Sequence, residues 1–297
     1  HPAPLPSKWR LFFAGLRDLP GVVAANLPGA IRGSRAGRRI VADWRREGRT
    51  LPPTPGDPDY PAPYATRLSP RRTFAARSFP LARIRAVGKS LGVTINDVFL
   101  ATLAGAIRAL LREQTGTAPT APMVATVPFA LVPLERRTRD GNFSTTCHTL
   151  LHTDVADPVE RLQACKRSAD TMKAYFEATR EANLTAVLNL LPPLVPKLVD
   201  RINELKSGGL LPFWNVVASN VPGPRAPLQL GQLKLTQWFS IGQLAHGASL
   251  NVTVWSYVDQ FNLSVLSDPK VLDDAWHLVD QFEASLVELE AAAQGAR

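Results

Sequence analysis

The most informative stretch of the sequence is Ser219-Asn220-Val221-Pro222-Gly223-Pro224, which directly follows the apolar run Phe213-Trp214-Asn215-Val216-Val217-Ala218. The apolar run predicts a buried strand. The Pro-Gly-Pro sequence predicts a tight turn, because proline fixes φ and glycine tolerates conformations that other residues avoid. A strand that carries Ser and Asn to its end and then stops at such a turn can place a hydroxyl and an amide in a cleft. The stretch therefore predicts one edge of a binding site.

Strands and helices alternate on both sides of this stretch, which predicts an α/β fold. We expect strands over 72–78, 123–129, 142–153, 213–219 and 234–239, and a hairpin that joins 250–257 to 261–267. We expect helices over 81–91 and 96–114, and another that begins at Pro158 with Asp157 as its N-cap. A closing helix is expected to bury one face made of Leu272, Trp276, Val279, Phe282, Leu286 and Leu289.

The chain divides by composition into two parts. Residues 1–50 are expected to be helical with breaks at Pro20 and Pro28, and residues 51–63 form a proline-rich connector. We therefore predict a basic helical segment with its connector over 1–72 and a folded lobe over 73–297. The chain starts at His1 without a signal sequence, so we expect it to be a piece of a longer polypeptide.

Composition excludes several classes of protein. With 45% hydrophobic residues, the 297-residue chain can bury a large core, and prolines interrupt its longest apolar stretches, so no membrane-spanning helix is expected. Two cysteines, Cys147 and Cys165, do not make a disulfide framework, and a reducing cytosolic setting is the default. No Cys/His cluster has metal-site spacing, so no metal is expected.

The net charge of +9 is carried entirely by residues 1–80, which hold 14 lysines and arginines against 5 acids. Apolar side chains, among them Trp9, Phe12 and Phe13, lie between these basic residues. Two interpretations stay open: docking on an anionic membrane surface, or the solvated face of a packed helical linker. The sequence contains no nucleic-acid recognition motif, so no nucleic acid is expected as a partner.

The segment from Thr94 to Asp97 has a structural and a functional interpretation. Thr94 can cap the following helix while Asp97, three residues later, bonds back to it. This capping box explains Thr94 and Asp97 but does not require Asn96, whose amide could order a loop or line a channel. Both interpretations remain open.

Several motifs, in order along the chain, resemble the C-terminal half of bacterial wax ester synthase/diacylglycerol acyltransferases. They are Thr94-Ile95-Asn96-Asp97-Val98, Val127-Pro128-Phe129 through Gly141-Asn142, Ala156-Asp157-Pro158, Ser219 through Pro224, and Leu250-Asn251-Val252-Thr253 followed by Ser256-Tyr257. The resemblance covers essentially the whole chain. It implies a chloramphenicol-acetyltransferase-like fold, as in coenzyme A-dependent acyltransferases, with two α/β lobes and a tunnel between them. This chain would be the C-terminal lobe with its preceding helical linker.

The resemblance also implies an activity: transfer of a fatty acyl group from acyl-CoA to diacylglycerol, giving triacylglycerol, or to a long-chain alcohol, giving a wax ester. The family's catalytic motif, H-H-x-x-x-D-G, has no counterpart here, and the nearest imitation, His148 through Asp154, has the wrong spacing. We therefore expect no catalytic residue on this chain, a base histidine in an absent N-terminal half, and no activity from this piece alone. Acyl-CoA would be a substrate, and no permanently bound cofactor is expected.

The chain would then supply the opposite wall of the tunnel, with Ser219 and Asn220 as polar contacts and the Pro-Gly-Pro turn to fix them. The predicted lining residues are Asn96, Asp97, Ser219, Asn220, Gly223, Gln243 and His246. The alternative is that Ser219 and Asn220 only end a strand and satisfy a loop. His148 and His152 are expected to be strand residues, and His277 to be solvated on the last helix.

Three classes of function remain open. The first is part of a lipid acyltransferase whose partners are acyl-CoA, its lipid acceptor and the N-terminal half. The second is a non-catalytic module that binds a lipid or membrane surface, and the third is another acyltransferase of the same fold. For the first class we expect a cytoplasmic protein, peripheral to the inner membrane or to lipid inclusions.

Overall fold

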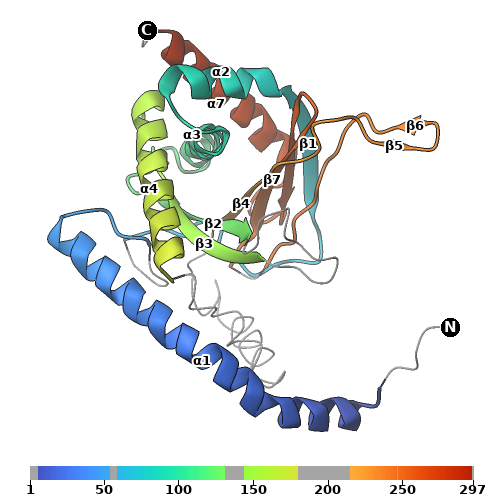
Figure 1. Ribbon diagram of the computed structural model, residues 1–297. Helices are drawn as coiled ribbons and strands as arrows, with labels where there is room; N and C mark the ends of the chain where they lie inside the picture. The colour runs from blue at the N-terminus through green and yellow to red at the C-terminus, as the bar shows by residue number, and fades with distance from the viewer. Residues whose placement is uncertain (1–5, 54–58, 131–143, 180–214, 246, 296–297) are drawn as a thin grey trace. The chain divides into compact units, whose positions relative to one another are not determined.

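The computed structural model describes residues 6–53, 59–130, 144–179, 215–245 and 247–295 (Figure 1). The contacts divide the chain into two compact units, one of residues 1–51 with 173–201 and one of residues 52–172 with 202–297. The larger unit holds every strand of the described chain.

The larger unit is built on a mixed six-stranded sheet in the order β1-β8-β7-β4-β2-β3. The strands are β1 (Thr73–Pro80), β2 (Met123–Ala130), β3 (Ser144–Leu151), β4 (Val216–Val221), β7 (Leu250–Tyr257) and β8 (Gln260–Ser267). The central strand β4 runs parallel to both of its neighbours, β2 and β7, and all other pairs are antiparallel. The fold is therefore a mixed α/β fold around a central sheet.

Helices cover one face of this sheet, as Figure 1 shows. They are α2 (Leu81–Leu91), α3 (Ile95–Thr115), α7 (Ala275–Gly295) and the first turns of α4 (Pro158–Thr179). The rings of Phe99 on α3, Phe261 on β8 and Phe282 on α7 meet at centroid distances of 6.2 and 6.3 Å. These fully buried rings join the helical layer to the sheet.

No single described helix has both the length and the apolar composition to span a bilayer; α2 and α3 meet those criteria only together, bent by 101°. Residues Val98 to Ile107 of α3 are all buried in the larger unit. The apolar character of α3 is therefore explained by core packing.

The strands and helices expected over 72–114, 123–153 and 250–267 are confirmed, with bounds shifted by at most a few residues. The β7–β8 hairpin pairs Val252 with Val265 and Val254 with Leu263, and all four side chains are buried in one core. Asp157 caps α4, since its Oδ1 accepts from the backbone N–H groups of Val159 and Glu160 at 2.9 and 2.8 Å. Local sequence patterns were therefore sufficient to predict these strands and helices, the hairpin and the N-cap.

The strand expected over 234–239 is wrong. Only Leu233–Lys234 (β6) is extended, paired with Gln229–Leu230 (β5) in a separate two-stranded ribbon. The residues that follow are held by side chains instead: the Nε2 of Gln237 donates to the Oγ of Ser78 at 2.9 Å, and the Trp238 ring stacks on Trp255 at 5.0 Å. These contacts attach the segment to the sheet without a backbone ladder.

The buried face expected for the last helix is wrong at one position. Trp276 is 46% exposed, and the Arg77 guanidinium lies over its ring, 5.6 Å from the centroid. Leu278, which the prediction omitted, is buried instead. The buried stripe of α7 runs through Ala275, Val279 and Phe282. Trp276 lies about 100° around the helix from Ala275, just beyond the edge of that stripe.

In the smaller unit, α1 (Lys8–Arg46) is one helix, so the breaks expected at Pro20 and Pro28 are wrong. Each proline removes one backbone donor and crowds the preceding turn, which can bend a helix without ending it. Figure 1 shows such a bend in the N-terminal part of α1. The helix buries Gly33, Gly37 and Trp44, and a Cβ added at Gly37 would lie 2.8 Å from the Cγ2 of Thr179 at the end of α4.

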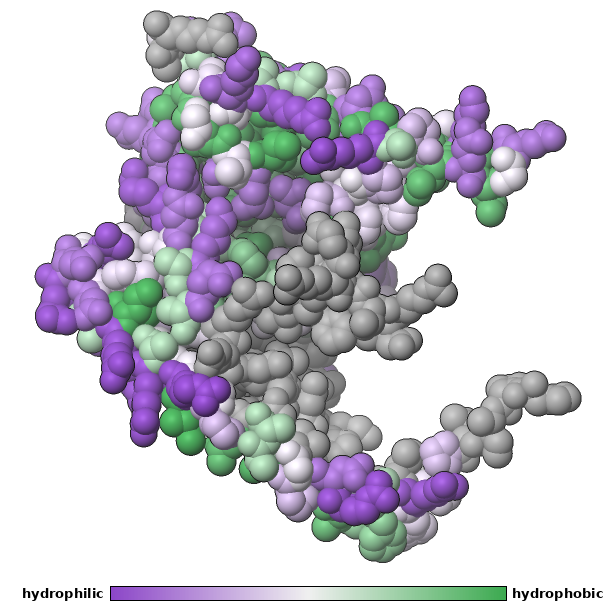
Figure 2. Space-filling model, in the orientation of Figure 1, coloured by the Kyte–Doolittle hydropathy of each residue, from purple (hydrophilic) through white to green (hydrophobic). Residues whose placement is uncertain are grey.

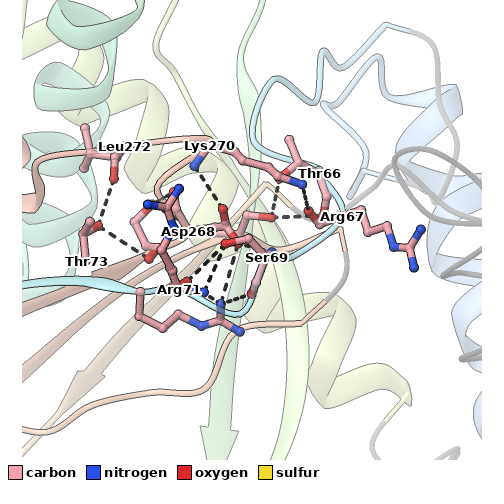
Figure 3. A network of polar contacts seen from close by, with 11 residues as sticks. Thr66, Arg67, Ser69, Arg71, Thr73, Asp268, Lys270 and Leu272 are labelled. Atoms are coloured by element: carbon pink, nitrogen blue, oxygen red, sulfur yellow. Dashed lines mark hydrogen bonds and ion pairs between the residues drawn. The ribbon is translucent and has the colours of Figure 1, made fainter.

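Residues 59–72 contain no helix or strand, yet Tyr64 is buried and Asp268 ties the segment to the end of β8 (Figure 3). The Asp268 carboxylate accepts from the backbone N–H groups of Ser69 and Lys270, and the Arg72 guanidinium lies 3.6 Å from it. Burial raises the pKa of Asp268, but these donors and the Arg72 charge outweigh it, so the pKa lies below its usual value. This buried carboxylate holds the segment together with other bonds, among them the one from the Ser249 N–H to the carbonyl oxygen of Tyr64 at 3.2 Å.

Candidate active-site wall

The face of the sheet opposite the helices carries a row of polar side chains across its centre. Ser219 of β4 lies beside Thr253 of β7, and Thr253 lies opposite Ser264 of β8. Partners on neighbouring strands point to the same side of a sheet. Because Val252 and Val265 on these strands point into the helical core, Ser219, Thr253 and Ser264 point away from it.

Hydrogen bonds connect this row to the segment that follows β6. The Oγ1 of Thr253 donates to the Oδ1 of Asn251 at 2.7 Å, and the Nδ2 of Asn251 donates to the carbonyl oxygen of Gln243 at 3.3 Å. A Cβ added at Gly242 would lie 2.2 Å from that Nδ2, so the backbone can approach Asn251 closely only at a glycine. The structure thus brings Gln243 to the same sheet face as Ser219.

Ser219 and Asn220 point to opposite faces of the sheet, because successive side chains of a strand alternate. Asn220 pairs with Val254, whose side chain is buried in the helical core, so Asn220 points toward the helical side at the end of β4. Neither the Ser219 hydroxyl nor the Asn220 amide has a hydrogen-bond partner among the described residues. Both groups are therefore available to a ligand at the strand end.

Gly223 is held against the β7–β8 hairpin. Its backbone N–H donates to the Oγ of Ser256 at 3.1 Å, and a Cβ at Gly223 would lie 2.0 Å from the carbonyl oxygen of Ser256. The N–H of Val258 donates to the carbonyl oxygen of Pro224 at 2.9 Å. The Pro-Gly-Pro turn is thus fixed by close packing, and the glycine is required by lack of space.

Asn96 and Asp97 lie at the start of α3, on the helical side of the sheet. The predicted capping box is present: the Asp97 Oδ2 accepts from the N–H and the Oγ1 of Thr94, at 2.9 and 2.8 Å. The Asp97 Oδ1 is buried without a partner among the described residues. Capping therefore accounts for one carboxylate oxygen of Asp97, and no described hydrogen bond links this pair to Ser219 or Gln243.

Burial lowers the pKa of two of the histidines. His148, on β3, lies with its Nδ1 3.3 Å from the Oγ1 of Thr126, and burial lowers its pKa to about 4. His152 follows the same strand, and burial also lowers its pKa, opposed by Asp154 and aided by Arg167. The exposed His277 pairs with Glu113 at 2.8 Å. His246 lies outside the described residues, and its predicted role stays a prediction.

Ser168, His152 and Asp154 have the order of a nucleophile, a base and an orienting acid. The His152 Nε2 lies 2.9 Å from the Ser168 Oγ, and its Nδ1 lies 3.7 Å from the Asp154 Oδ1. The longer distance exceeds a hydrogen bond, and Ser168 lies within α4, where the backbone N–H groups are used by the helix and leave no oxyanion donors. We therefore assign His152 to the attachment of α4 to β3.

Neither cysteine is activated, since burial raises the pKa of Cys147 to about 11 and that of Cys165 still further. Within the described ranges, no three His, Cys, Asp or Glu side chains are grouped so that they could hold a metal ion.

Sequence reasoning quoted Asn251 and Thr253 only as part of a family motif and did not predict them as members of this wall. The signal was present, because Asn251 and Thr253 alternate with the core residues Leu250, Val252 and Val254. Two polar side chains on one face of a central strand indicate that this face is not an ordinary core face. What the alternation did not show was which other strands lie beside it.

The sequence matches two family models: the WS/DGAT C-terminal domain over residues 140–290 and the wax ester synthase/diacylglycerol acyltransferase catalytic domain over residues 3–99. The chain therefore belongs to the wax ester synthase/diacylglycerol acyltransferase family. The two matches cover the basic segment, the connector, the capping box and the strands that form the polar face.

Among curated relatives, a candidate diacylglycerol O-acyltransferase from Mycobacterium tuberculosis strain H37Rv is 46% identical over 99% of this chain and 62% of its own length. The O-acyltransferase WSD of Acinetobacter baylyi is 32% identical over 74% of this chain and 46% of its own length. The chain thus spans less than two thirds of the length of these relatives.

Among solved structures, the wax ester synthase/diacylglycerol acyltransferase from Marinobacter aquaeolei VT8 superposes with a TM-score of 0.61, at 27% identity, over 88% of this chain and 57% of that one. The first condensation domain of the calcium-dependent antibiotic synthetase superposes with a TM-score of 0.50 at 15% identity, over 98% of this chain and 58% of that one. The second likeness shows the fold alone, that of coenzyme A-dependent acyltransferases.

Proposed function

We propose that this chain is part of an O-acyltransferase that moves a fatty acyl group from acyl-CoA to the hydroxyl of diacylglycerol or of a long-chain alcohol. Membership of the family supports the reaction class. The polar face around β4 and β7 supports a role in holding substrate, because polar side chains without partners at a strand end are poised for an external ligand.

In this reaction a base takes the proton of the acceptor hydroxyl as the oxygen attacks the thioester carbonyl. The tetrahedral oxyanion then collapses, and coenzyme A leaves as the thiol. We propose that the base is a histidine from the rest of the protein, because the described His148 and His152 are bound to Thr126 and Ser168. This chain would contribute the Ser219 hydroxyl from one face of the sheet and the Asn220 amide from the other, as donors to different groups of a substrate or intermediate bound at the end of β4.

The observation that carries the proposal is the pair of unpartnered polar groups at the end of β4, fixed by the Gly223 turn. In the full-length protein, we expect Ser219→Ala and Asn220→Ala each to lower kcat/KM by about tenfold or more, as when one hydrogen bond to substrate or intermediate is lost. Thiol release from acyl-CoA, measured with diacylglycerol and with a long-chain alcohol, gives the rates and the acceptor preference.

Thr146→Ala is a matched control, since Thr146 is an exposed polar residue on strand β3. We expect this variant to keep wild-type turnover. If Ser219→Ala and Asn220→Ala fold normally and also keep wild-type turnover, the two residues only end the strand and do not touch the substrate.

We propose further that the chain is inactive without the rest of the protein. The expected result is no thiol release by residues 1–297 alone, and release when the remaining part is joined or co-expressed. Turnover by the isolated chain would place the base on this chain and contradict the proposal.

A second candidate function is a lipid-surface module without catalysis, favoured by the exposed aromatic side chains of α1. It predicts no thiol release from the full-length protein with any acceptor. Under either function we propose a cytoplasmic protein that is peripheral to the inner membrane or to lipid inclusions.

A further inference from the structure

The N-terminal part of α1 exposes a continuous apolar stripe, which we call the α1 stripe. It consists of Trp9, Phe12, Phe13, Leu16, Leu27 and Ile31. Trp9 is 72% exposed and Phe13 is 64% exposed, although both are large apolar residues. One face of the helix carries Trp9, Phe13, Leu16, Leu27 and Ile31, which Pro20 and Val23 link at steps of three or four residues, and Phe12 lies at the edge of this face.

The aromatic end of the α1 stripe is a cluster of three rings. Trp9 lies 6.3 Å from both Phe12 and Phe13, and these two lie 5.6 Å apart, measured between ring centroids. The rings contact one another and remain exposed. The cluster is therefore an apolar patch that stays exposed to solvent, as at a site of interaction.

The α1 stripe differs from the face by which α1 packs in its own unit. The packed face runs through Gly33, Gly37 and Trp44, which are buried, and Gly37 faces Thr179. Within the part of this unit that the structure describes, α1 therefore packs on one side, and the residues of the stripe stay exposed.

Arginines flank the α1 stripe and continue beyond it. The helix carries nine lysines and arginines against two aspartates. Arg35, Arg38 and Arg39 are exposed and form no ion pair within the described part of the chain. Figure 2 shows green apolar groups along the lower edge of α1, with purple groups beside them. The surface is therefore apolar and cationic at once.

We propose that the α1 stripe docks on an anionic lipid bilayer, with Trp9, Phe12 and Phe13 inserted at the interface and the arginines that follow bound to lipid phosphates. Exposed aromatic side chains beside unpaired arginines fit this occupant, because the bilayer offers an apolar layer under a negatively charged surface. The proposal deepens the proposed function, on which it rests, by placing the enzyme where apolar acceptors dissolve.

The test measures binding of the full-length protein to sedimented vesicles of phosphatidylcholine, with and without phosphatidylglycerol. We expect binding that requires phosphatidylglycerol and weakens at least tenfold at high salt, since the charges of the bilayer surface are screened. The combined variant Trp9→Ala, Phe12→Ala and Phe13→Ala should bind at least tenfold more weakly. The combined change of Arg35, Arg38 and Arg39 to Gln should weaken binding and reduce its salt dependence.

The matched control removes exposed apolar side chains elsewhere. Leu228, Leu230 and Leu233 lie at the β5–β6 ribbon, and the last two are 80% and 73% exposed. Replacing all three by alanine should change vesicle binding less than twofold. An equal loss in this control would show that binding depends on general apolar exposure and would overturn the proposal.

A second measurement does not depend on the aromatic variant folding. Brominated lipids should quench part of the tryptophan fluorescence of the wild-type protein, and Trp9→Phe should remove that part while binding persists. Absence of quenching at Trp9 in the full-length protein would mean that another part of the protein covers the stripe, and the proposal would be wrong.

Vesicle binding needs no turnover, so it can succeed even if the acyl-transfer proposal fails. Conversely, the aromatic variant should keep wild-type thiol release when the acceptor is dispersed in detergent. Docking and catalysis are thereby tested separately.

Discussion

At the scale of single residues, Gly223 shows that close packing can require glycine in a turn. The backbone of the Pro-Gly-Pro turn passes so close to the carbonyl oxygen of Ser256 that an added Cβ would lie 2.0 Å from it. The obstacle is backbone, which cannot rotate away as a flexible side chain can. The same turn ends the strand that carries Ser219 and Asn220, so its position decides where their side chains lie.

We predict that Gly223→Ala lowers the free energy of unfolding by about 2 kcal/mol or more, the cost of an unrelieved overlap in a packed region. Chemical denaturation of the two proteins measures the difference. Gly15→Ala, at a helix position with nothing within 4 Å of the added Cβ, is the control and should be neutral or stabilising. Equal stability of Gly223→Ala and the wild type would mean that the hairpin moves aside freely.

At the scale of elements, the start of α3 combines an N-terminal cap with a buried Asp97 oxygen that the cap does not use. The Thr94 hydroxyl and N–H bind one oxygen of Asp97, and the other oxygen is buried without a described partner. A capping box requires only the first oxygen. Mutations at Thr94 and at Asp97 can therefore separate capping from any further role of the second Asp97 oxygen.

We predict that Thr94→Ala costs about 1 kcal/mol of stability, typical of a lost N-cap, and leaves the acyl-transfer kcat/KM proposed for the full-length protein nearly unchanged. If Asp97 also contacts the substrate, Asp97→Asn should lower kcat/KM by more than its effect on stability explains. Thermal unfolding and thiol release on both variants measure the two effects. If Asp97→Asn lowers kcat/KM no more than its loss of stability explains, Asp97 acts in capping alone.

At the scale of the whole molecule, the larger unit depends on contacts between distant parts of the chain. Asp268, at the end of β8, binds the backbone of Ser69, 199 positions earlier in the sequence. The carboxylate is one of several long-range contacts that hold residues 59–72, which lack regular secondary structure (Figure 3). The same residues precede β1, one of the two edge strands of the sheet.

We predict that Asp268→Ala destabilises the protein by about 3 kcal/mol at pH 7, because backbone donors to a charged group lose their acceptor. The pKa of Asp268 is lower in the folded than in the unfolded protein, so its contribution is complete above the unfolded value of about 3.9. It is lost as the pH falls from there through the folded pKa. Urea unfolding from pH 7 to pH 2 measures both effects.

The acid-induced loss of stability should be smaller in Asp268→Ala than in the wild type. Asp273→Ala serves as the control, since Asp273 is exposed and accepts from the neighbouring Asp274 N–H. A wild-type acid profile in Asp268→Ala would mean that other carboxylates govern acid unfolding.

Local sequence patterns were enough to predict the family, the α/β class and most element bounds. Strand and helix periodicity, caps such as Thr94 and Asp157, and turns such as Pro222-Gly223-Pro224 act over a few residues, so a short window of sequence contains them. The same patterns were wrong at Pro20 and Pro28, because α1 continues through both prolines. They were also wrong at Trp276, which lies at the edge of the buried stripe of α7 and is exposed.

Which polar groups share a face could be known only from the tertiary structure. The pairing of β4 with β7 brings Ser219 to Thr253, the segment over 235–245 adds Gln243, and the alternation of β4 sends Asn220 to the other side. The tertiary structure also showed that lack of space requires Gly223 and that α1 leaves its aromatic stripe exposed. The physical reason is that these features depend on strand order and close packing between residues far apart in the chain, which no local pattern specifies.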